Sequence, residues 1–245
     1  MPLVTTYSIT RDQIISSALR KLGALELGDT PDANTVTNAA LILNLMIKHW
    51  QTDGIKLWTT TEYTVPLTAS KTSYTIGPTG TSSDITADRP MKLIQGWLRN
   101  TSVTPNIDTP LQILSKQEYN ILGSKFSTGT ANSVYLFPLQ TTSTVYFFLT
   151  PDTATATNYV ARLIARRPLG DISASGDMPD FPNEWMNALV WGLADQLALE
   201  YSSPLNHRAE IQAKATLYKD QLNDWDVEAE STFFIPDARN RSGYR

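Results

Sequence analysis

Apolar residues recur every three or four positions near the start of the chain, which predicts an amphipathic helix. Thr10 and Gln13 match a capping box, in which each side chain satisfies a free backbone donor. The residues from 14 to 22 place their apolar side chains on one face, and Gly23 follows where a left-handed C-cap is needed. We therefore expect the first helix to start after Thr10 and to end at Gly23.

A second apolar pattern follows and predicts a longer helix. Thr30 is the expected N-cap, and Pro31 would occupy the first helical position, where a missing N–H has no cost. From Val36 to Trp50 the apolar residues step by four and three, an average period of 3.5, and further apolar positions widen this seam. The second helix is therefore expected to be buried on more than one side.

The last third of the chain carries two more helical patterns. One is expected to begin near Pro182, and its large apolar residues recur every four positions from Trp185 to Tyr201, with alanines beside them. Pro204 separates it from the next pattern, which steps by four and three from Ile211 to Ala229. Both helices have long apolar faces that need partners.

The middle of the chain has a different spacing, typical of a β-rich region. Short β-prone runs alternate with Gly, Pro, Asn and Asp. Ser115 and Glu118 form a second capping box that predicts one short helix, and the Thr-rich stretch 150–158 is expected to be a hairpin tip. The expected strands are Leu57–Val65, Ser73–Ile76, Met91–Arg99, Leu111–Leu114, Val134–Phe137, Thr144–Leu149 and Val160–Arg166.

These patterns together predict an α+β fold. The economical arrangement is a four-helix bundle formed by both chain ends, with an antiparallel β domain inserted between its second and third helices and an extended C-terminal tail. The expected boundaries are residues 1–55 and 169–231 for the discontinuous bundle, 56–168 for the inserted β domain and 232–245 for a C-terminal arm.

Composition narrows the class of protein. Of the 245 residues, 41% are hydrophobic and only 18% are charged, and the formal net charge is −4. A general nucleic-acid binder has a basic excess, because phosphate neutralisation supplies most of its affinity. There is no cysteine, so disulfides and thiolate metal sites are excluded. We expect neither a signal peptide nor a membrane span.

Candidate catalytic groups are few. His49 and His207 lie on different predicted helices without a surrounding motif, and no phosphate loop or nucleophile elbow is present. Asp177, Asp180 and Glu184 cluster near the third long helix, where they could complement its dipole or supply a glycosidase-like carboxylate pair. We expect no enzyme activity, no cofactor and no metal.

Two charged groups are candidates for contacts between subunits or for the lining of a channel. Arg162 and Arg166 are four residues apart on the last predicted strand and would share one of its faces. Negative charge at a helix C-terminus is unfavourable, yet four acids gather at the end of the last helix. They form either a solvated face or an acidic rim that meets a neighbour or repels DNA: Asp224, Asp226, Glu228 and Glu230.

The C-terminal arm has a composition of its own. The apolar residues 233–236 precede the segment 237–245, which has three arginines and one aspartate. Neither stretch has a helical period, so the arm cannot bury itself against its own fold. It is expected to be disordered or bound to a partner.

The order of these pieces resembles the head-to-tail adaptor proteins of short-tailed bacteriophages, including the packaged-DNA stabilisation and tail tubular protein A types. The likeness extends from about residue 10 to residue 236. It is carried by the motifs Ile14–Leu22, Trp50-Gln51-Thr52-Asp53-Gly54, Leu57-Trp58, Ser73–Gly77, Pro90–Ile94, Arg167-Pro168 and Phe181–Trp185.

This resemblance implies a structural virion protein at the head-tail junction, assembled in the host cytoplasm. Such adaptors form rings, commonly of twelve copies, beneath the portal protein, where they retain packaged double-stranded DNA and contact the tail nozzle or tail tube. Their C-terminal segment reaches onto the portal. Its counterparts here are Phe233, Phe234, Ile235, Pro236, Arg239, Arg241, Tyr244 and Arg245.

Two other functions compete with the adaptor. The Thr-rich β region and the carboxylates near residue 180 also fit a carbohydrate-binding or cell-wall hydrolytic module. A tail or baseplate component elsewhere in a virion is the other alternative.

Overall fold

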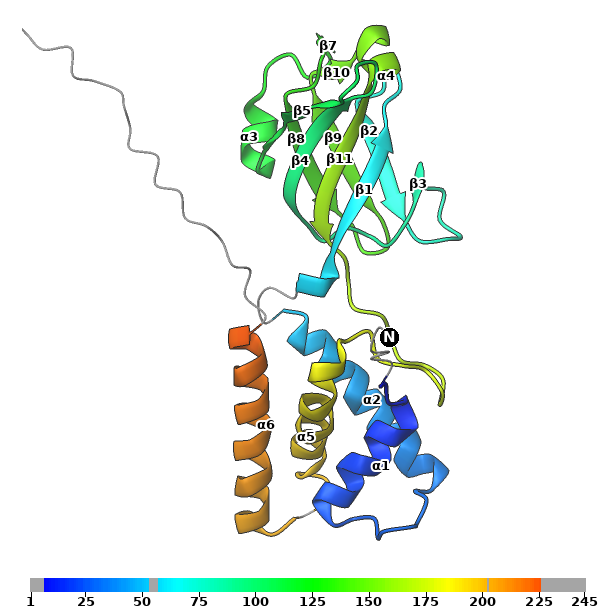
Figure 1. The fold of residues 1–245 in the computed structure, drawn as a ribbon, viewed down its shortest axis with the longest axis vertical. Coiled ribbons are helices and arrows are strands. Elements are labelled where there is room, and N and C mark those ends of the chain that lie inside the picture. Colours follow the sequence, from blue (N-terminus) through cyan, green and yellow to red (C-terminus); the bar gives the residue numbers. More distant parts are fainter. Residues whose placement is uncertain (1–6, 53–56, 202, 226–245) are drawn as a thin grey trace, which may run out of the picture.

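Two separate hydrophobic cores organise the chain. The computed structural model describes residues 7–52, 57–201 and 203–225. One core joins helices from both chain ends, and the other fills the space between two β-sheets. Figure 1 shows the helical region below the β region along the long axis of the molecule.

The first helix follows its prediction closely. Helix α1 spans Arg11–Leu22, and Thr10 accepts a hydrogen bond from the backbone N–H of Gln13 while the Gln13 side chain accepts one from the Thr10 N–H. Gly23 has a φ of 72°, a left-handed conformation that glycine adopts without a steric penalty. The capping box and the C-cap are both confirmed.

The start of the second helix differs from its prediction. Helix α2 spans Ala33–Trp50, and its N-cap is Asp32, whose carboxylate accepts from the N–H groups of Asn34 and Thr35 at 2.9 and 3.1 Å. Aspartate is a better N-cap than threonine, so the helix begins later than Thr30 and leaves Pro31 outside it. The prediction of Thr30 as the N-cap was wrong.

Helix α5 is the centre of the helical region. It spans Met186–Leu197 after a short 3-10 helix, η2 (Asn183–Trp185), and it packs against α1, α2 and α6. Helix α6 spans Leu205–Trp225 and buries only Ile211 and Ala215, chiefly against α5. The other three long helices are therefore gathered around α5, and the four do not contribute equally to one central core.

Four aromatic rings close the end of the helical core that faces the β region. Trp185 is fully buried, and its ring centroid lies 5.2 Å from that of Trp58, 5.9 Å from that of Phe181 and 6.1 Å from that of Trp50. Trp58 belongs to the 3-10 helix η1 (Leu57–Thr59), and its indole N–H donates to the backbone oxygen of Asp180 at 3.0 Å. The cluster thus joins both connections between the two regions.

The β region is a sandwich of two sheets with a short additional pair. The four-stranded sheet has the order β1-β11-β4-β5, the five-stranded sheet has the order β3-β2-β9-β8-β6, and β10 pairs with β7. The strands are β1 (Thr60–Pro66), β2 (Ser73–Gly77), β3 (Ile85–Thr86), β4 (Lys92–Asn100), β5 (Ile107–Pro110), β6 (Gln112–Ile113), β7 (Thr128–Gly129), β8 (Ser133–Pro138), β9 (Ser143–Phe148), β10 (Thr150–Pro151) and β11 (Tyr159–Arg166).

The predicted fold class was wrong in its description of the fold as a four-helix bundle with an antiparallel insertion. The described residues contain six α-helices, because α3 (Lys116–Ile121) and α4 (Thr153–Asn158) lie in the β region. The stretch 150–158 forms β10 and α4 instead of a hairpin tip, since Asp152 caps α4. Three strand pairs are parallel, so the pairing is mixed. The structure is a mixed α+β fold with extensive sheets.

An ion pair fixes the chain where it returns from the β region to the helices. The Arg167 guanidinium donates to both carboxylate oxygens of Asp180, which also accepts from the Gly170 N–H at 3.2 Å. Burial raises the pKa of the Asp180 carboxyl, but the hydrogen bonds from Arg167 and Gly170 and the charge of Arg167 outweigh it, so the pKa lies below its ordinary value.

We expect Asp180→Asn to lower the free energy of unfolding at pH 7 by about 1–3 kcal/mol, since Arg167 loses its charged acceptor. A lowered pKa in the folded state stabilises the protein above the carboxyl's unfolded pKa, and this contribution is lost as pH falls through the folded value. Urea unfolding at several pH values should therefore show the two proteins converging below about pH 4. A difference between their free energies of unfolding that stays constant with pH would contradict this role of the carboxylate.

Candidate functional site

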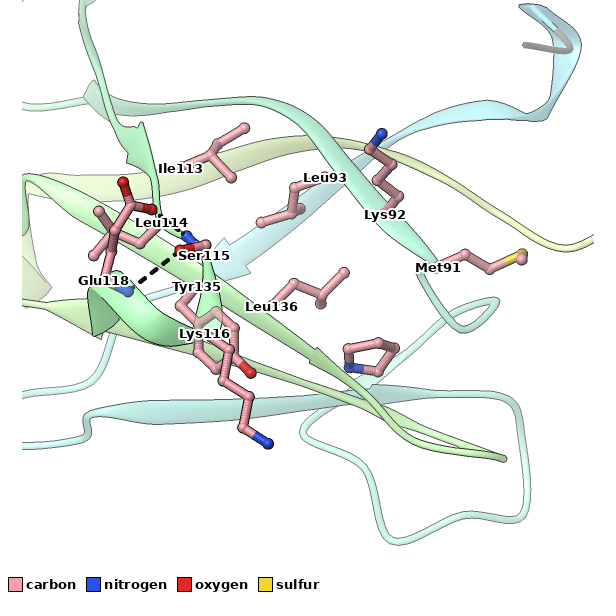
Figure 2. Close-up of a pocket in the computed structure, with 11 residues that line it drawn as sticks. Met91, Lys92, Leu93, Ile113, Leu114, Ser115, Lys116, Glu118, Tyr135 and Leu136 are labelled. Atoms are coloured by element: carbon pink, nitrogen blue, oxygen red, sulfur yellow. Dashed lines mark hydrogen bonds between the residues drawn. The ribbon is translucent and has the colours of Figure 1, made fainter. Parts of the chain in front are cut away.

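A groove on the β region is lined by four elements from three separate stretches of the chain. It has a volume of about 550 Å³ and lies between the start of β4, the edge strand β6, the first turn of α3 and the end of β8. Its wall is apolar, with Leu93, Leu114 and Leu136 among the residues that line it (Figure 2). Lys92 and Lys116 lie on opposite rims.

The capping box predicted at Ser115 positions the helix beside this groove. The Glu118 N–H donates to the Ser115 hydroxyl at 3.2 Å, and the Ser115 N–H donates to the Glu118 carboxylate at 2.7 Å, as the dashed lines in Figure 2 show. These hydrogen bonds hold the pKa of Glu118 below its usual value. Glu118 therefore has a structural role as an ionised cap and is not poised to act as an acid.

Three stacked tyrosines cover the outer face of the five-stranded sheet next to the groove. The ring of Tyr119 from α3 stacks on Tyr135 of β8 at 5.1 Å between centroids, and Tyr135 stacks on Tyr146 of β9 at 5.9 Å. Burial, followed by the nearby Tyr146, raises the pKa of Tyr135. The three rings therefore stack on one another, so these contacts cover part of their aromatic surface.

The outer face of the four-stranded sheet carries both predicted arginines. Burial alternates along β11, so Arg162 and Arg166 lie on the same, partly exposed face. The Arg162 guanidinium donates to Glu62 at 3.1 Å and to the Thr64 hydroxyl at 2.7 Å on β1. Arg166 lies opposite Lys92 of β4 in the strand register.

A second ion pair on this face partly neutralises it. Arg99 of β4 donates to both carboxylate oxygens of Asp108 on β5, at 2.8 and 2.7 Å. The hydrogen bond from Arg99 is the main cause of a lowered pKa for Asp108. Acids thus hold Arg99 and Arg162, and Arg166 lies beside Lys92 at the end of the face toward the helical region.

The predicted acidic cluster lies mostly beyond the described residues. Asp224 is exposed in the last turn of α6. Asp226, Glu228 and Glu230 lie outside the described residues, as do all eight residues of the arm expected to bind the portal: Phe233, Phe234, Ile235, Pro236, Arg239, Arg241, Tyr244 and Arg245.

Two of the three carboxylates considered for glycoside hydrolysis, Asp177 and Asp180, have structural partners. Asp177 accepts from the N–H groups of Ser173 and Ala174 at 2.8 and 2.6 Å, and Asp180 is engaged by Arg167. Within residues 7–52, 57–201 and 203–225, no group of three or more His, Cys, Asp or Glu side chains could hold a metal ion. The same ranges contain no helix long and apolar enough to cross a membrane.

Comparison with protein families decides between the remaining alternatives. The family model described as the SU10 adaptor protein matches residues 9–237, which is nearly the whole chain. The chain belongs to the SU10 adaptor protein family. Comparison with the curated proteins gives no match.

Membership in the SU10 adaptor family confirms the resemblance to phage adaptors. The protein is a bacteriophage adaptor, a structural component of the virion, and the family implies contacts with other head and tail proteins and a role other than catalysis. The match begins before α1 and includes both cores, so both regions of the chain belong to the family's pattern.

The groove beside α3 was missed by sequence reasoning. The capping box of Ser115 and Glu118 and the predicted strands Met91–Arg99, Leu111–Leu114 and Val134–Phe137 all contribute to its walls, but the sequence did not show that these elements meet. Strand β6 has two residues and pairs in parallel with β8, a pairing that short-range patterns do not reveal.

Proposed function

We propose that this SU10-family adaptor forms a ring, of twelve copies by analogy with other phage adaptors, between the portal protein and the tail. The ring retains packaged double-stranded DNA in the filled head and provides the platform for a tail nozzle or tail tube. The observation that carries the proposal is the family match over residues 9–237. Assembly takes place in the host cytoplasm before the protein becomes part of the virion.

Exposed apolar side chains on the helical region support assembly with other copies. Leu41 and Leu45 are 59% and 61% exposed on one face of α2, and Leu205 and Leu217 are 79% and 53% exposed on α6. Leu41 and Leu45 are one helical turn apart, and neighbouring exposed apolar residues of this kind are typical of protein–protein contacts. Contacts between two different faces close into a ring when the rotation between copies divides the circle.

Each segment of the chain has a separate role in the proposed ring. Residues 1–55 and 169–231 form the wall of the ring, and residues 56–168 contact the tail or neighbouring copies. The arginine face with Arg162 and Arg166 contacts another copy or lines the channel, and the acidic residues after Trp225 contribute to the same assembly. Residues 232–245 form the arm that binds the portal. The net charge of −4 gives passing DNA no general attraction.

Deleting the gene for this protein from its phage tests the proposed function. We expect filled heads that lose their DNA and carry no tails, because nothing closes the portal. A plasmid copy of the full chain should restore DNA retention and tail attachment. Mutant particles that keep their DNA and bind tails would contradict the proposal.

A further inference from the structure

A line of basic side chains connects the helical region to the groove beside α3. A cavity of about 180 Å³ lies between the two regions and is lined by Gln51 of the α2 C-cap, by Arg166 and by Lys92. Met91 and Lys92 line both this cavity and the groove, so the two adjoin. We call Arg166, Lys92 and Lys116, which follow one another along these two hollows, the basic track.

The lysines of the basic track have no acidic partner within the described residues of the chain. Lys92 and Lys116 are both exposed and form none of the ion pairs found there. The Lys116 ammonium lies 5.5 Å from the centroid of the Phe137 ring, a contact that leaves its charge accessible. Between them the wall of the groove is apolar (Figure 2). The track therefore fits a segment that combines acidic and apolar side chains.

The strand edge inside the groove is open to an extended chain. Strand β6 pairs with β8 only at Ser133 and Val134, and the Leu114 N–H extends the ladder to the Val134 oxygen at 2.8 Å. Strand β8 continues to Pro138, so its edge beyond Val134 faces the groove without a neighbouring strand in the described residues. Extended segments add to open edges of this kind.

A chain of contacts links helix α6 to the start of the basic track. The Lys219 ammonium lies 5.4 Å from the centroid of the Trp50 ring at the end of α2, and the next residue, Gln51, contacts the sulfur of Met91 at 3.0 Å. The end of α6 at Trp225 is six residues after Lys219, about 9 Å farther along the helix. Figure 1 shows this end of α6 on the side of the helical region that faces the β region.

The sequence after Trp225 has the matching pattern. Asp226-Val227-Glu228-Ala229-Glu230 alternates acidic and apolar residues with a period of two, the period of a β-strand, and only Ala229 of this stretch belongs to the helical spacing that begins at Ile211. In an extended chain the acids would follow one another at intervals of about 6.6 Å. The segment has no basic residue, so its charge is complementary to that of the basic track.

We propose that residues 226–232 lie along the basic track as an extended strand, with their acidic side chains on Lys92 and Lys116 and their apolar side chains on the groove. Docking of this segment also explains why acids gather at a helix C-terminus, where they are unfavourable on their own. The inference concerns the segment before the portal-binding arm and does not rest on the ring or on the portal.

Disulfide crosslinking in the full chain tests the docked segment, because the natural sequence has no cysteine. One variant combines Ile113→Cys on β6 with Ala229→Cys, and the matched control combines Leu199→Cys with Ala229→Cys. Leu199 is 65% exposed and follows α5, whose C-terminal end lies away from the β region (Figure 1). We expect the Ile113 pair to oxidise at least about tenfold faster than the control, because docking raises the effective concentration of the two thiols.

The mobility of the product on a denaturing gel distinguishes a segment docked on its own chain from one docked on a neighbouring copy, and either product supports the proposal. Equal rates in the two pairs would overturn it. Because the reaction needs no portal, such a failure would leave the proposed adaptor function untouched.

Charge reversal tests the basic track itself. In the crosslinking background, Lys92→Glu with Lys116→Glu should slow oxidation by about threefold to tenfold, since each exposed ion pair contributes modestly. Adding Glu228→Lys and Glu230→Lys should restore the rate. Circular dichroism serves as the control that the variants are folded. An oxidation rate that changes with neither set of substitutions would refute the electrostatic match.

Discussion

Replacing Trp185 with alanine is expected to lower the free energy of unfolding by about 3–5 kcal/mol, the range for removing a buried large aromatic side chain. Trp185 has no exposed surface, and its ring contacts Trp50, Trp58 and Phe181. The loss would affect both regions of the protein, because this aromatic cluster joins the helical core to the two connections with the β region.

Urea unfolding followed by far-UV circular dichroism measures this loss. Trp225→Ala is the matched control, since Trp225 is 68% exposed at the end of α6 and its removal should change stability by less than about 0.5 kcal/mol. If Trp185→Ala lowers the free energy of unfolding by less than about 1 kcal/mol, the aromatic cluster does not have this structural role.

Helix ends were predictable from sequence where a local hydrogen bond decides them. The capping boxes at Thr10 and Ser115 involve residues three apart, so the sequence contains all of their partners. The start of α2 was misplaced because two capping candidates, Thr30 and Asp32, lie close together and the stronger one prevailed. Local chemistry therefore predicts the type of an element better than its first residue.

Arrangements that depend on distant pairings were not predictable. The shared face of Arg162 and Arg166 was predictable, because it follows from the strand period alone. The partners of that face, Glu62 from β1 and Lys92 from β4, come from strands far apart in sequence. The groove beside α3 has the same origin, because its walls come together only through the pairing of β6 with β8 and the packing of the two sheets.

The prediction of a bundle failed for a related reason. The heptad-like spacing of α6 indicated a helix with a long seam, but only Ile211 and Ala215 are buried. Spacing shows which side of a helix is apolar and does not show which protein chain covers it. We expect the exposed apolar residues of α6 to be covered in the assembled virion.

Removing the C-terminal arm is expected to abolish binding to the portal. Residues 233–236 are apolar, and three arginines follow within nine residues against one aspartate, so the arm offers apolar anchors and cations to a partner. Extended segments of this kind add contacts to a neighbouring protein and lose conformational entropy on binding. Replacing Arg239, Arg241 and Arg245 with glutamine should weaken binding without abolishing it, because the apolar anchors remain.

Replacing Ser242 with alanine is the matched control for these substitutions, because it changes the arm without changing its charge or its apolar residues. Its affinity for the portal should equal that of the natural chain. If the arginine variant also binds with unchanged affinity, the arm does not act through its charge.

Cosedimentation with purified portal rings of the same phage tests the adaptor account most directly. It compares the full chain with a chain that ends at Glu230, which keeps the acidic segment and lacks the arm. The account predicts that the full chain binds to saturation at a fixed number of copies per portal and that the shortened chain stays in the supernatant. Equal binding of both chains would contradict the role of the arm, and no binding by either would contradict the head-to-tail adaptor itself.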